Sequence, residues 1–291
     1  MPDTAAAVTF VGLGAIGLPM LQRLVDGGID VTGVDPFPGA RERAQAVGAA
    51  TVGAIGDAPA AAVVVAMVAT PDQLDTLVDQ ALAAGAVRGQ LWAVMSTVGP
   101  EAVVSAAARL TDAGAAVVDA PVTGGVARAR TGELTIFASG AEASIARLEP
   151  VLSRFGAVRI VGDEVGRGQA IKVVNQHLCC SVHIVAAAEA LALATALGLD
   201  PAEVLPLLES GAAGSWMLSD RGPRMLEGTD VEVTSQINIF VKDSGLVYDA
   251  ARAAGAESPL LDAARERYLA AQADGLGTRD DSRVIETYRR R

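Results

Sequence analysis

Short apolar segments alternate with alanine-rich helical segments over the first half of the chain. The apolar segments are rich in β-branched residues and carry few polar ones, which is typical of parallel strands covered by helices on both faces. The alternation therefore predicts a doubly wound α/β sheet. The predicted strands are Val8–Val11, Val31–Val34, Val63–Val68, Leu91–Met95, Val117–Asp119, Leu134–Ala138 and Val158–Val161.

The pattern changes after about residue 161. One long apolar helix is predicted from Gly168 to Leu197, and most of the sequence that follows is helical in pattern. Within that part, the Gly222-Pro223 pair predicts a break. We therefore expect an N-terminal α/β domain, residues 1–163, and an all-α C-terminal domain, residues 164–291, joined by the long helix.

A glycine-rich turn joins the first predicted strand to the first predicted helix. Such glycines allow a tight turn and let a pyrophosphate approach a helix N-terminus, where unpaired N–H groups favour negative charge. Because the turn lies between a strand and a helix, it predicts a dinucleotide-binding domain of the Rossmann type. The turn consists of Gly12, Leu13, Gly14, Ala15, Ile16 and Gly17.

The end of the second predicted strand bears on the choice of dinucleotide. Asp35 stands there, and its carboxylate can accept hydrogen bonds from adenosine ribose hydroxyls while repelling a 2′-phosphate. Pro36 follows, and no arginine comes directly after it. We therefore expect NAD in preference to NADP, although Arg41 and Arg43 lie near enough in sequence to keep NADP open.

A polar stripe runs along one face of the long helix. Lys172, Asn175, Gln176, Cys179 and His183 follow helical spacing, and the other positions are mostly apolar. Lys172 should therefore be largely buried, and burial lowers the pKa of a lysine toward the range useful for acid–base catalysis. The alternative is that its side chain extends to the surface near the helix start. His183 is more simply an ordinary helix histidine.

Few other side chains offer acid–base or metal chemistry. The chain has 2 His, 2 Cys and 3 Tyr, and it contains no Tyr-x-x-x-Lys pair, no Gly-x-Ser-x-Gly turn and no Walker loop. We expect no metal site, because the histidines and cysteines do not form a ligand set. If hydride is transferred, Lys172 is the best candidate for the proton carrier.

The composition of the chain limits the kinds of partner that it is expected to bind. The net charge of −11, with only 5 Phe, 2 Trp and 3 Tyr, argues against nucleic acid. We expect no membrane span, because the longest apolar run is too short and the stretch around Ile184 is interrupted by His183 and Glu189. Cys179 and Cys180 should diverge on a helix, so reduced thiols and a cytoplasmic location are expected.

Four segments together resemble the β-hydroxyacid dehydrogenase family, which includes 3-hydroxyisobutyrate dehydrogenase. Their order and spacing fit over nearly the whole chain. The resemblance implies an NAD(P)-binding Rossmann domain, an interdomain helix with a catalytic lysine, and an all-α domain that supports a homodimer or homotetramer. The segments are Phe10–Met20, Asp119–Gly125, Gly168–Gln176 and Phe240–Asp243.

The resemblance also implies roles for single residues. Lys172 would donate and accept the proton, while Asn175 or Gln176 would hold the substrate hydroxyl. The substrate carboxylate would bind at Thr123, Gly124 and Gly125. Beyond the glycine turn, Asp35 and Pro36, the implied cofactor contacts are Val68, Ala69, Gln73, Thr97 and Lys242.

Within the family, the segments Gly211–Met217 and Ile239–Asp243 look most like the branch of L-threonate and related acid-sugar dehydrogenases. The expected activity is reversible NAD-linked oxidation of a small β-hydroxy acid. Two alternatives remain: an imine reductase on the same scaffold, against which Lys172 counts, and a dinucleotide-binding protein without turnover.

Overall fold

The computed structural model describes residues 7–289, and the chain forms two compact units, Met1–Lys172 and Val173–Arg291. The division between the two units falls within the long helix that begins at Arg167, whereas the domain boundary expected from sequence, between residues 163 and 164, precedes that helix. The earlier boundary stays a prediction.

A nine-stranded sheet forms the centre of the first unit, in the order β3-β2-β1-β4-β5-β6-β8-β7 with β9 paired to β8. Strands β1 to β6 are parallel, and β8 is antiparallel to β6 and β7. The chain builds outward from β1 to β3 and then returns to the other side of β1, so the strand order reverses between β1 and β4. The strands are β1 (Val8–Val11), β2 (Val31–Val34), β3 (Ala50–Val52), β4 (Val63–Ala66), β5 (Leu91–Val94), β6 (Ala116–Asp119), β7 (Val122–Thr123), β8 (Leu134–Ser139) and β9 (Gly156–Gly162).

The predicted doubly wound sheet is confirmed, with two strands that the sequence pattern missed. Strands β3 and β7 have three and two residues, which is too short for a recognisable alternation. β3 also lies at the edge of the sheet, where its residues are exposed or half-buried and need not be apolar.

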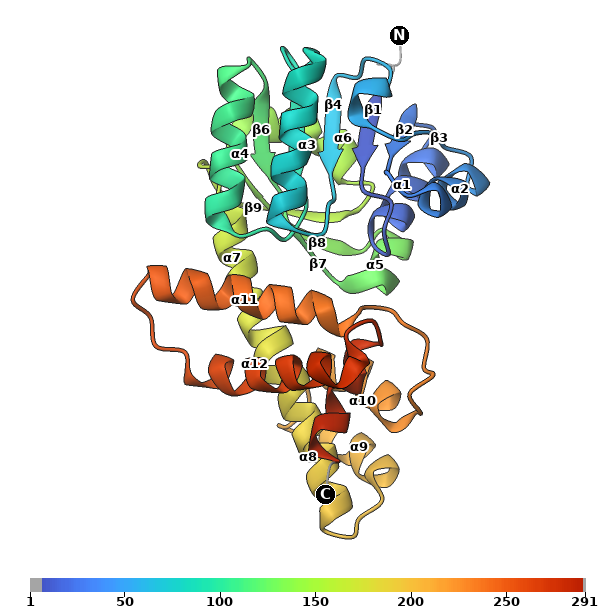
Figure 1. The fold of residues 1–291 in the computed structure, drawn as a ribbon, viewed down its shortest axis with the longest axis vertical. Coiled ribbons are helices and arrows are strands. Elements are labelled where there is room, and N and C mark those ends of the chain that lie inside the picture. Colours follow the sequence, from blue (N-terminus) through green and yellow to red (C-terminus); the bar gives the residue numbers. More distant parts are fainter. Residues whose placement is uncertain (1–6, 290–291) are drawn as a thin grey trace. The chain divides into compact units, whose positions relative to one another are not determined.

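Helices cover both faces of the sheet. Residues of α1, α2 and α6 pack on one face and residues of α3 and α4 pack on the other, where Figure 1 shows α3 and α4 in front of the strands. Arg109 of α4 forms ion pairs with Asp75 and Asp79 of α3, which tie these two helices together. The bounds are α1 (Gly17–Asp26), α2 (Pro38–Ala46), η1 (Ile55–Asp57), α3 (Pro71–Ala84), α4 (Pro100–Asp112), α5 (Gly125–Thr131) and α6 (Glu142–Leu152).

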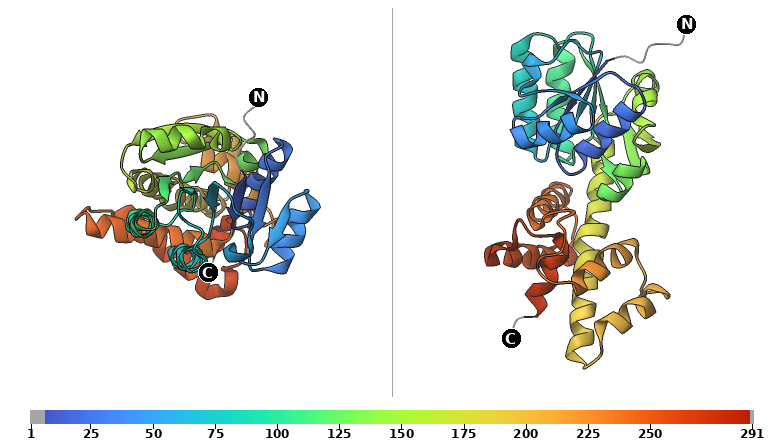
Figure 2. Two further views of the ribbon diagram at one scale, coloured as in Figure 1. Left: turned by 90° about the horizontal axis from the view of Figure 1, so that it is seen from above. Right: turned by 90° about the vertical axis from the view of Figure 1, so that its right-hand side faces the viewer.

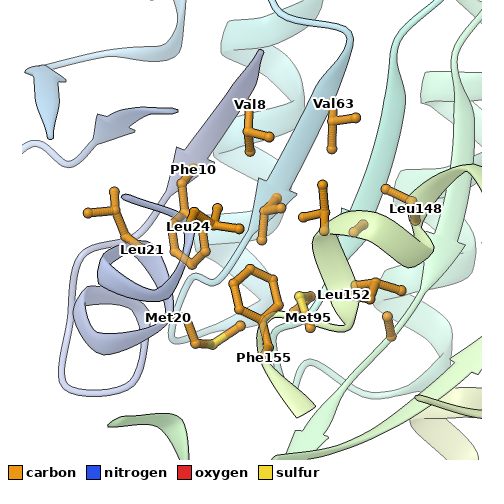
Figure 3. Packing of buried hydrophobic residues seen from close by; sticks show 14 of the residues in the cluster. Val8, Phe10, Met20, Leu21, Leu24, Val63, Met95, Leu148, Leu152 and Phe155 are labelled. Atoms are coloured by element: carbon orange, nitrogen blue, oxygen red, sulfur yellow. The ribbon is translucent and has the colours of Figure 1, made fainter. Parts of the chain in front are cut away.

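The larger core of the first unit lies under α1 and α6. The rings of Phe10, on β1, and Phe155, which follows α6, meet edge to face with centroids 6.1 Å apart. Both side chains are fully buried, and Met20 and Met95 pack in the same cluster (Figure 3). Aromatic pairs in this geometry add stability beyond the area they bury.

The second unit consists of helices around the C-terminal part of the long helix. That helix includes α7, a wider π-helical segment η2, and α8. Helices α9 to α12 and η4 each contact η2 or α8 (Figure 2). The bounds are α7 (Arg167–Gln176), η2 (His177–Ile184), α8 (Val185–Ala196), α9 (Pro201–Glu209), α10 (Trp216–Leu226), α11 (Ile237–Ala253), α12 (Pro259–Ala271), η3 (Gln272–Leu276) and η4 (Asp281–Tyr288).

The predicted break at Gly222-Pro223 is wrong, because both residues lie inside α10. A Cβ atom at position 222 would lie 2.6 Å from a methyl carbon of Leu205 in α9. The glycine thus serves close packing of α9 against α10 rather than a turn.

The expectation of no membrane span stays a prediction: one helix meets the length and composition criteria of a span, and core helices of proteins outside membranes meet the same criteria. It runs from Arg167 to Ala196, and 44% of its most apolar window is buried within the protein. Ile184, Ala188 and Leu191 on this helix are fully buried in the core of the second unit. Packing within this core accounts for the apolar composition of the buried face.

Replacing Phe155 by Ala should destabilise the first unit by about 3–5 kcal/mol, because the substitution leaves a cavity beside Phe10. Urea unfolding followed by the fluorescence of Trp92, which is fully buried in this unit, measures the loss. A Trp216→Phe background removes the second tryptophan signal.

Phe37→Ala is the matched control, because the Phe37 ring is 69% exposed and its removal should cost less than about 1 kcal/mol. Equal losses in the two variants would show that the Phe10–Phe155 contact does not stabilise the core.

Candidate active site

The glycine turn after β1 has the geometry that a dinucleotide loop requires. A Cβ at position 12 would lie 2.3 Å from the carbonyl oxygen of Met67, and one at position 17 would lie 1.9 Å from that of Gly12. A Cβ at Gly14 would meet no heavy atom within 4 Å. Only glycine fits at positions 12 and 17 without a clash, and Gly12 also has a positive φ of 95°. At Gly14, by contrast, there is open space beside the turn. The turn fits a pyrophosphate approaching α1.

Asp35 holds this turn in place. Its Oδ2 accepts a hydrogen bond of 2.9 Å from the backbone N–H of Leu13, and its Oδ1 accepts one of 2.9 Å from that of Phe37. The Leu13 side chain is fully buried in the core, so this residue supports the turn rather than presenting a side chain to solvent. Ala15 and Pro36 are exposed and Ile16 is half-buried.

An arginine also lies next to Asp35. The Nη1 atom of Arg41 donates hydrogen bonds of 2.8 and 2.9 Å to the carbonyl oxygens of Asp35 and Pro36. This guanidinium is thus held against the backbone of the residue predicted to select the cofactor.

The other predicted cofactor contacts in the first unit follow β4, which pairs with β1, and β5, which pairs with β4, at the carboxyl edge of the sheet. Val68 and Ala69 follow β4, and the N–H of Ala69 donates a 2.8 Å hydrogen bond to Oε1 of Gln73 in α3. Thr97, half-buried, follows β5. Parallel neighbouring strands end at one edge, so these loops and the glycine turn share that edge.

The predicted carboxylate site follows β6 and includes β7. Thr123 ends β7, and Gly124 and Gly125 have positive φ values of 133° and 69°. A Cβ at Gly125 would meet nothing within 4 Å, so the backbone there is open on that side. Successive N–H groups in such a turn can form a concave site for an anion.

The start of α7 is fixed by a buried carboxylate at the end of β6. Oδ2 of Asp119 accepts hydrogen bonds from the backbone N–H groups of Gly166 and Gln169, at 3.1 and 2.8 Å. The N–H of Gly168 donates to Oγ of Ser139 at 2.9 Å. These are N-terminal amides of α7, where negative charge is favoured.

Burial raises the pKa of Asp119 above its usual value, and the hydrogen bonds from Gln169, Gly166 and Ser139 partly oppose this rise. The two backbone N–H donors and the Gln169 amide N–H all require an acceptor, which the carboxylate supplies.

The side chain of Gln169 connects Asp119 by hydrogen bonds to the loop after β5. Its Nε2 donates to Oδ1 of Asp119 at 3.0 Å and to the carbonyl oxygen of Ser96 at 2.9 Å. Its Oε1 accepts hydrogen bonds of 3.0 Å from the N–H groups of both Val98 and Gly99. The side chain is fully buried.

Lys172 lies one turn further along α7 and is only 5% exposed. The expectation that this lysine is buried is therefore confirmed, and the alternative in which it extends to the surface is wrong. Lys172 and Lys242 are the 2 lysines of the sequence, so every other basic residue among the 23 Lys and Arg is arginine.

In the second unit, the predicted Gln176 and Lys242 are joined through a residue that sequence reasoning missed. Nε2 of Gln176 donates a hydrogen bond to Oδ2 of Asp243, and Nζ of Lys242 lies 2.8 Å from Oδ1 of the same carboxylate. Asn175 donates a 3.0 Å hydrogen bond from Nδ2 to Oε1 of Gln176. The Asp243 side chain is almost completely buried, at 5% exposure.

The π-helical segment changes two expectations. It begins after Gln176, so a spacing of eleven residues no longer places His183 on the face of Lys172. The Sγ atoms of Cys179 and Cys180 also lie 3.4 Å apart rather than diverging. Among residues 7–289, no cluster of three or more His, Cys, Asp or Glu side chains could hold a metal ion.

Asp119, Gln169 and Asp243 are the main polar residues that the sequence did not single out by role. All three lie inside the segments that carry the family resemblance, next to residues that were singled out. The available signal was a polar residue at an otherwise apolar position, but the pairs Asp119–Gln169 and Asp243–Gln176 are 50 and 67 residues apart in sequence.

Two family models together match nearly the whole chain. Residues 7–168 match the NAD-binding domain of 6-phosphogluconate dehydrogenase, and residues 166–288 match a domain described as "NAD-binding of NADP-dependent 3-hydroxyisobutyrate dehydrogenase". An L-threonate dehydrogenase from Cupriavidus necator is 36% identical over 284 residues, covering 96% of this chain and 94% of that protein.

Solved structures agree with these matches. A 3-hydroxyisobutyrate dehydrogenase from Salmonella typhimurium has a TM-score of 0.86 at 35% identity, covering 96% of this chain and 99% of that one. The Mycobacterium tuberculosis 3-hydroxyisobutyrate dehydrogenase described with L-serine has a TM-score of 0.85 at 32% identity, covering 98% and 99%. A Streptomyces aurantiacus imine reductase, at 22% identity, a TM-score of 0.65 and coverage of 96% and 98%, shows the shared fold alone.

The glycine turn, the sheet topology and the buried lysine of α7 thus coincide with full-length similarity to named dehydrogenases. The chain belongs to the family of NAD(P)-dependent hydroxyacid dehydrogenases related to 3-hydroxyisobutyrate dehydrogenase.

Proposed function

We propose that this chain oxidises a small β-hydroxy acid reversibly, with Lys172 as the general acid and base. The observation that carries the proposal is the burial of Lys172 on α7, one turn from a helix start that is hydrogen-bonded to the sheet. Arginine keeps its proton at all relevant pH values, whereas a lysine amine can exchange one.

In this proposal the substrate is held through two groups, its carboxylate and the hydroxyl on its reacting carbon. The N–H groups and hydroxyl of Thr123, Gly124 and Gly125 bind the carboxylate, as the open positive-φ turn there allows. Asn175 or Gln176 holds the hydroxyl, and Lys172 removes its proton as the carbonyl forms. In the reverse direction, Lys172 returns the proton to the carbonyl oxygen.

Bound NAD(P) supplies the hydride acceptor. We propose that it lies along the carboxyl edge of β1, β4 and β5, with its pyrophosphate at the turn Gly12–Gly17 and with Val68, Ala69, Gln73 and Thr97 beside it. Lys242 is proposed near the nicotinamide. We propose NAD as the preferred form, because the Asp35 carboxylate would repel a 2′-phosphate; Arg41, held beside Asp35, supports the use of NADP once that charge is removed.

We also propose that the chain acts in the cytoplasm as a homodimer or homotetramer. Exposed apolar side chains on the long helix support self-association, because a stretch of apolar surface favours burial against another chain. They include Val174, Leu178 and Leu193, at 68%, 52% and 57% exposure.

Lys172→Ala should lower turnover by at least about 100-fold, the contribution of a positioned acid–base group, while the affinity for NADH stays within about threefold of the unchanged protein. Lys172→Arg is the matched variant: it keeps the positive charge but cannot exchange a proton, so it should be equally inactive. Steady-state rates and NADH fluorescence titration provide the two measurements, and near-normal turnover in Lys172→Ala would refute the mechanism.

Asp35→Ser should shift the ratio of kcat/KM for NAD over NADP toward NADP by at least about tenfold, because the repulsive carboxylate is removed while Arg41 remains in place. Asp30→Ala, a change of an exposed carboxylate just ahead of β2, is the control and should leave the ratio unchanged. An unchanged ratio in Asp35→Ser would remove Asp35 as the selector.

The substrate is tested with a panel of L-threonate, D-glycerate, 3-hydroxyisobutyrate, L-serine and 3-hydroxypropionate, each with NAD and with NADP. We expect reduced cofactor to accumulate with at least one of these acids, since each offers a carboxylate and a hydroxyl at the β carbon. A cyclic imine with NADPH forms the last assay. Activity with the imine alone would favour the imine reductase alternative, and dinucleotide binding without any turnover would favour a protein without catalysis.

A further inference from the structure

Gln169 joins the loop after β5, which carries the proposed cofactor contact Thr97, to helix α7, which carries Lys172. Four hydrogen bonds of 2.9 to 3.0 Å use both N–H groups and both acceptor positions of its carboxamide. The side chain is completely buried, so these groups have no access to solvent that could replace a lost partner.

The partners of Gln169 lie on both sides of Thr97. The carbonyl of Ser96 accepts from the carboxamide, and the N–H groups of Val98 and Gly99 donate to it. Three hydrogen bonds from one side chain therefore fix the backbone immediately before and after Thr97, a proposed cofactor contact.

The same residue begins the turn that carries the lysine. Its own backbone N–H and its Nε2 both bind Asp119, at the end of β6, and Lys172 follows three residues later. The helix can approach the sheet this closely because residue 168 is glycine: a Cβ there would lie 2.4 Å from the carbonyl oxygen of Phe137 and 2.9 Å from Oδ2 of Asp119.

We propose that Gln169 is a positioning residue that holds Lys172 in register with the loop carrying Thr97. This inference rests on the proposed role of Lys172. The two groups come from different elements, and a displacement of about 1 Å between reacting groups is enough to cost about 100-fold in rate. The backbone hydrogen bonds to Asp119 hold the helix to the sheet, and the Gln169 side chain links the first turn of the helix to the loop after β5.

The test compares Gln169→Leu with Gln90→Leu. Gln90 is a half-buried glutamine ahead of β5 that also bridges two groups, the carbonyl of Ala61 and the indole N–H of Trp92, at the other edge of the sheet. Both variants should lose thermal stability. Only Gln169→Leu should have a lower kcat, by about 10- to 100-fold when kcat is calculated per NADH-binding site. Its dissociation constant for NADH and its KM for the acid should change less than about threefold.

Gln169→Glu keeps the size of the side chain and provides a folded alternative if Gln169→Leu does not accumulate. Its carboxylate would face that of Asp119 near neutral pH, and two facing carboxylates raise the pKa of one of them. The ratio of its kcat to that of the unchanged protein should therefore rise as the pH falls and a proton is shared between the two groups. A merely structural role would lower the number of active molecules without changing kcat per NADH-binding site.

Lys172→Ala is assayed alongside, with the acid and dinucleotide that the panel shows to react fastest. If Lys172→Ala keeps its turnover, the proposed function fails and the inference fails with it. If Lys172→Ala is inactive while kcat in both Gln169 variants stays within about threefold of normal, the inference alone is overturned. Loss of NADH binding in Gln169→Leu would also overturn it, because the residue would then act on cofactor affinity rather than on the lysine.

Discussion

The buried carboxylate of Asp119 is the interaction on which the candidate site depends. It ends strand β6 and accepts hydrogen bonds from two N-terminal amides of α7, so the positive end of this helix is anchored to the sheet. A carboxylate at a helix N-terminus contributes up to about 2 kcal/mol when partly buried, and the amides it binds would otherwise be unsatisfied in the interior. Since Lys172 lies on the second turn of α7, the direction of this helix start determines where the lysine is presented.

The strand order supplies the other half of the site. Because the order reverses between β1 and β4, helices leave the sheet on opposite faces there, and the loops after β1, β4 and β5 line one edge. Glycines at positions 12 and 17 let the turn after β1 pack against Met67 and against itself, which leaves Gly14 facing open space. Asp35 accepts a hydrogen bond from the N–H of Leu13, so the residue proposed to select the cofactor also shapes the turn proposed to bind it.

Much of the fold and of the candidate site was predictable from the sequence, namely the parts that have a local sequence pattern. The parallel strands, the glycine turn and the burial of Lys172 follow from runs of apolar residues and from helical spacing. The misses have physical reasons. Strands β3 and β7 are too short to show alternation, and Gly222 permits close helix packing although Gly-Pro usually indicates a turn. The π-helical segment was not foreseen, because the shift from α to π hydrogen bonding after Gln176 leaves no mark in apolar spacing.

The sequence by itself determined the class of fold, the glycine turn after the first strand and the buried lysine, because each is encoded by residues close together in the chain. Only the tertiary structure decided how those parts are held. Gln169 meets the loop after β5 across 70 or more residues, and Asp243 meets Gln176 across 67, so neither pairing leaves a local periodic signal. Buried polar groups must find partners wherever the folded chain supplies them, and those partners become visible only when distant strands and helices have been brought together.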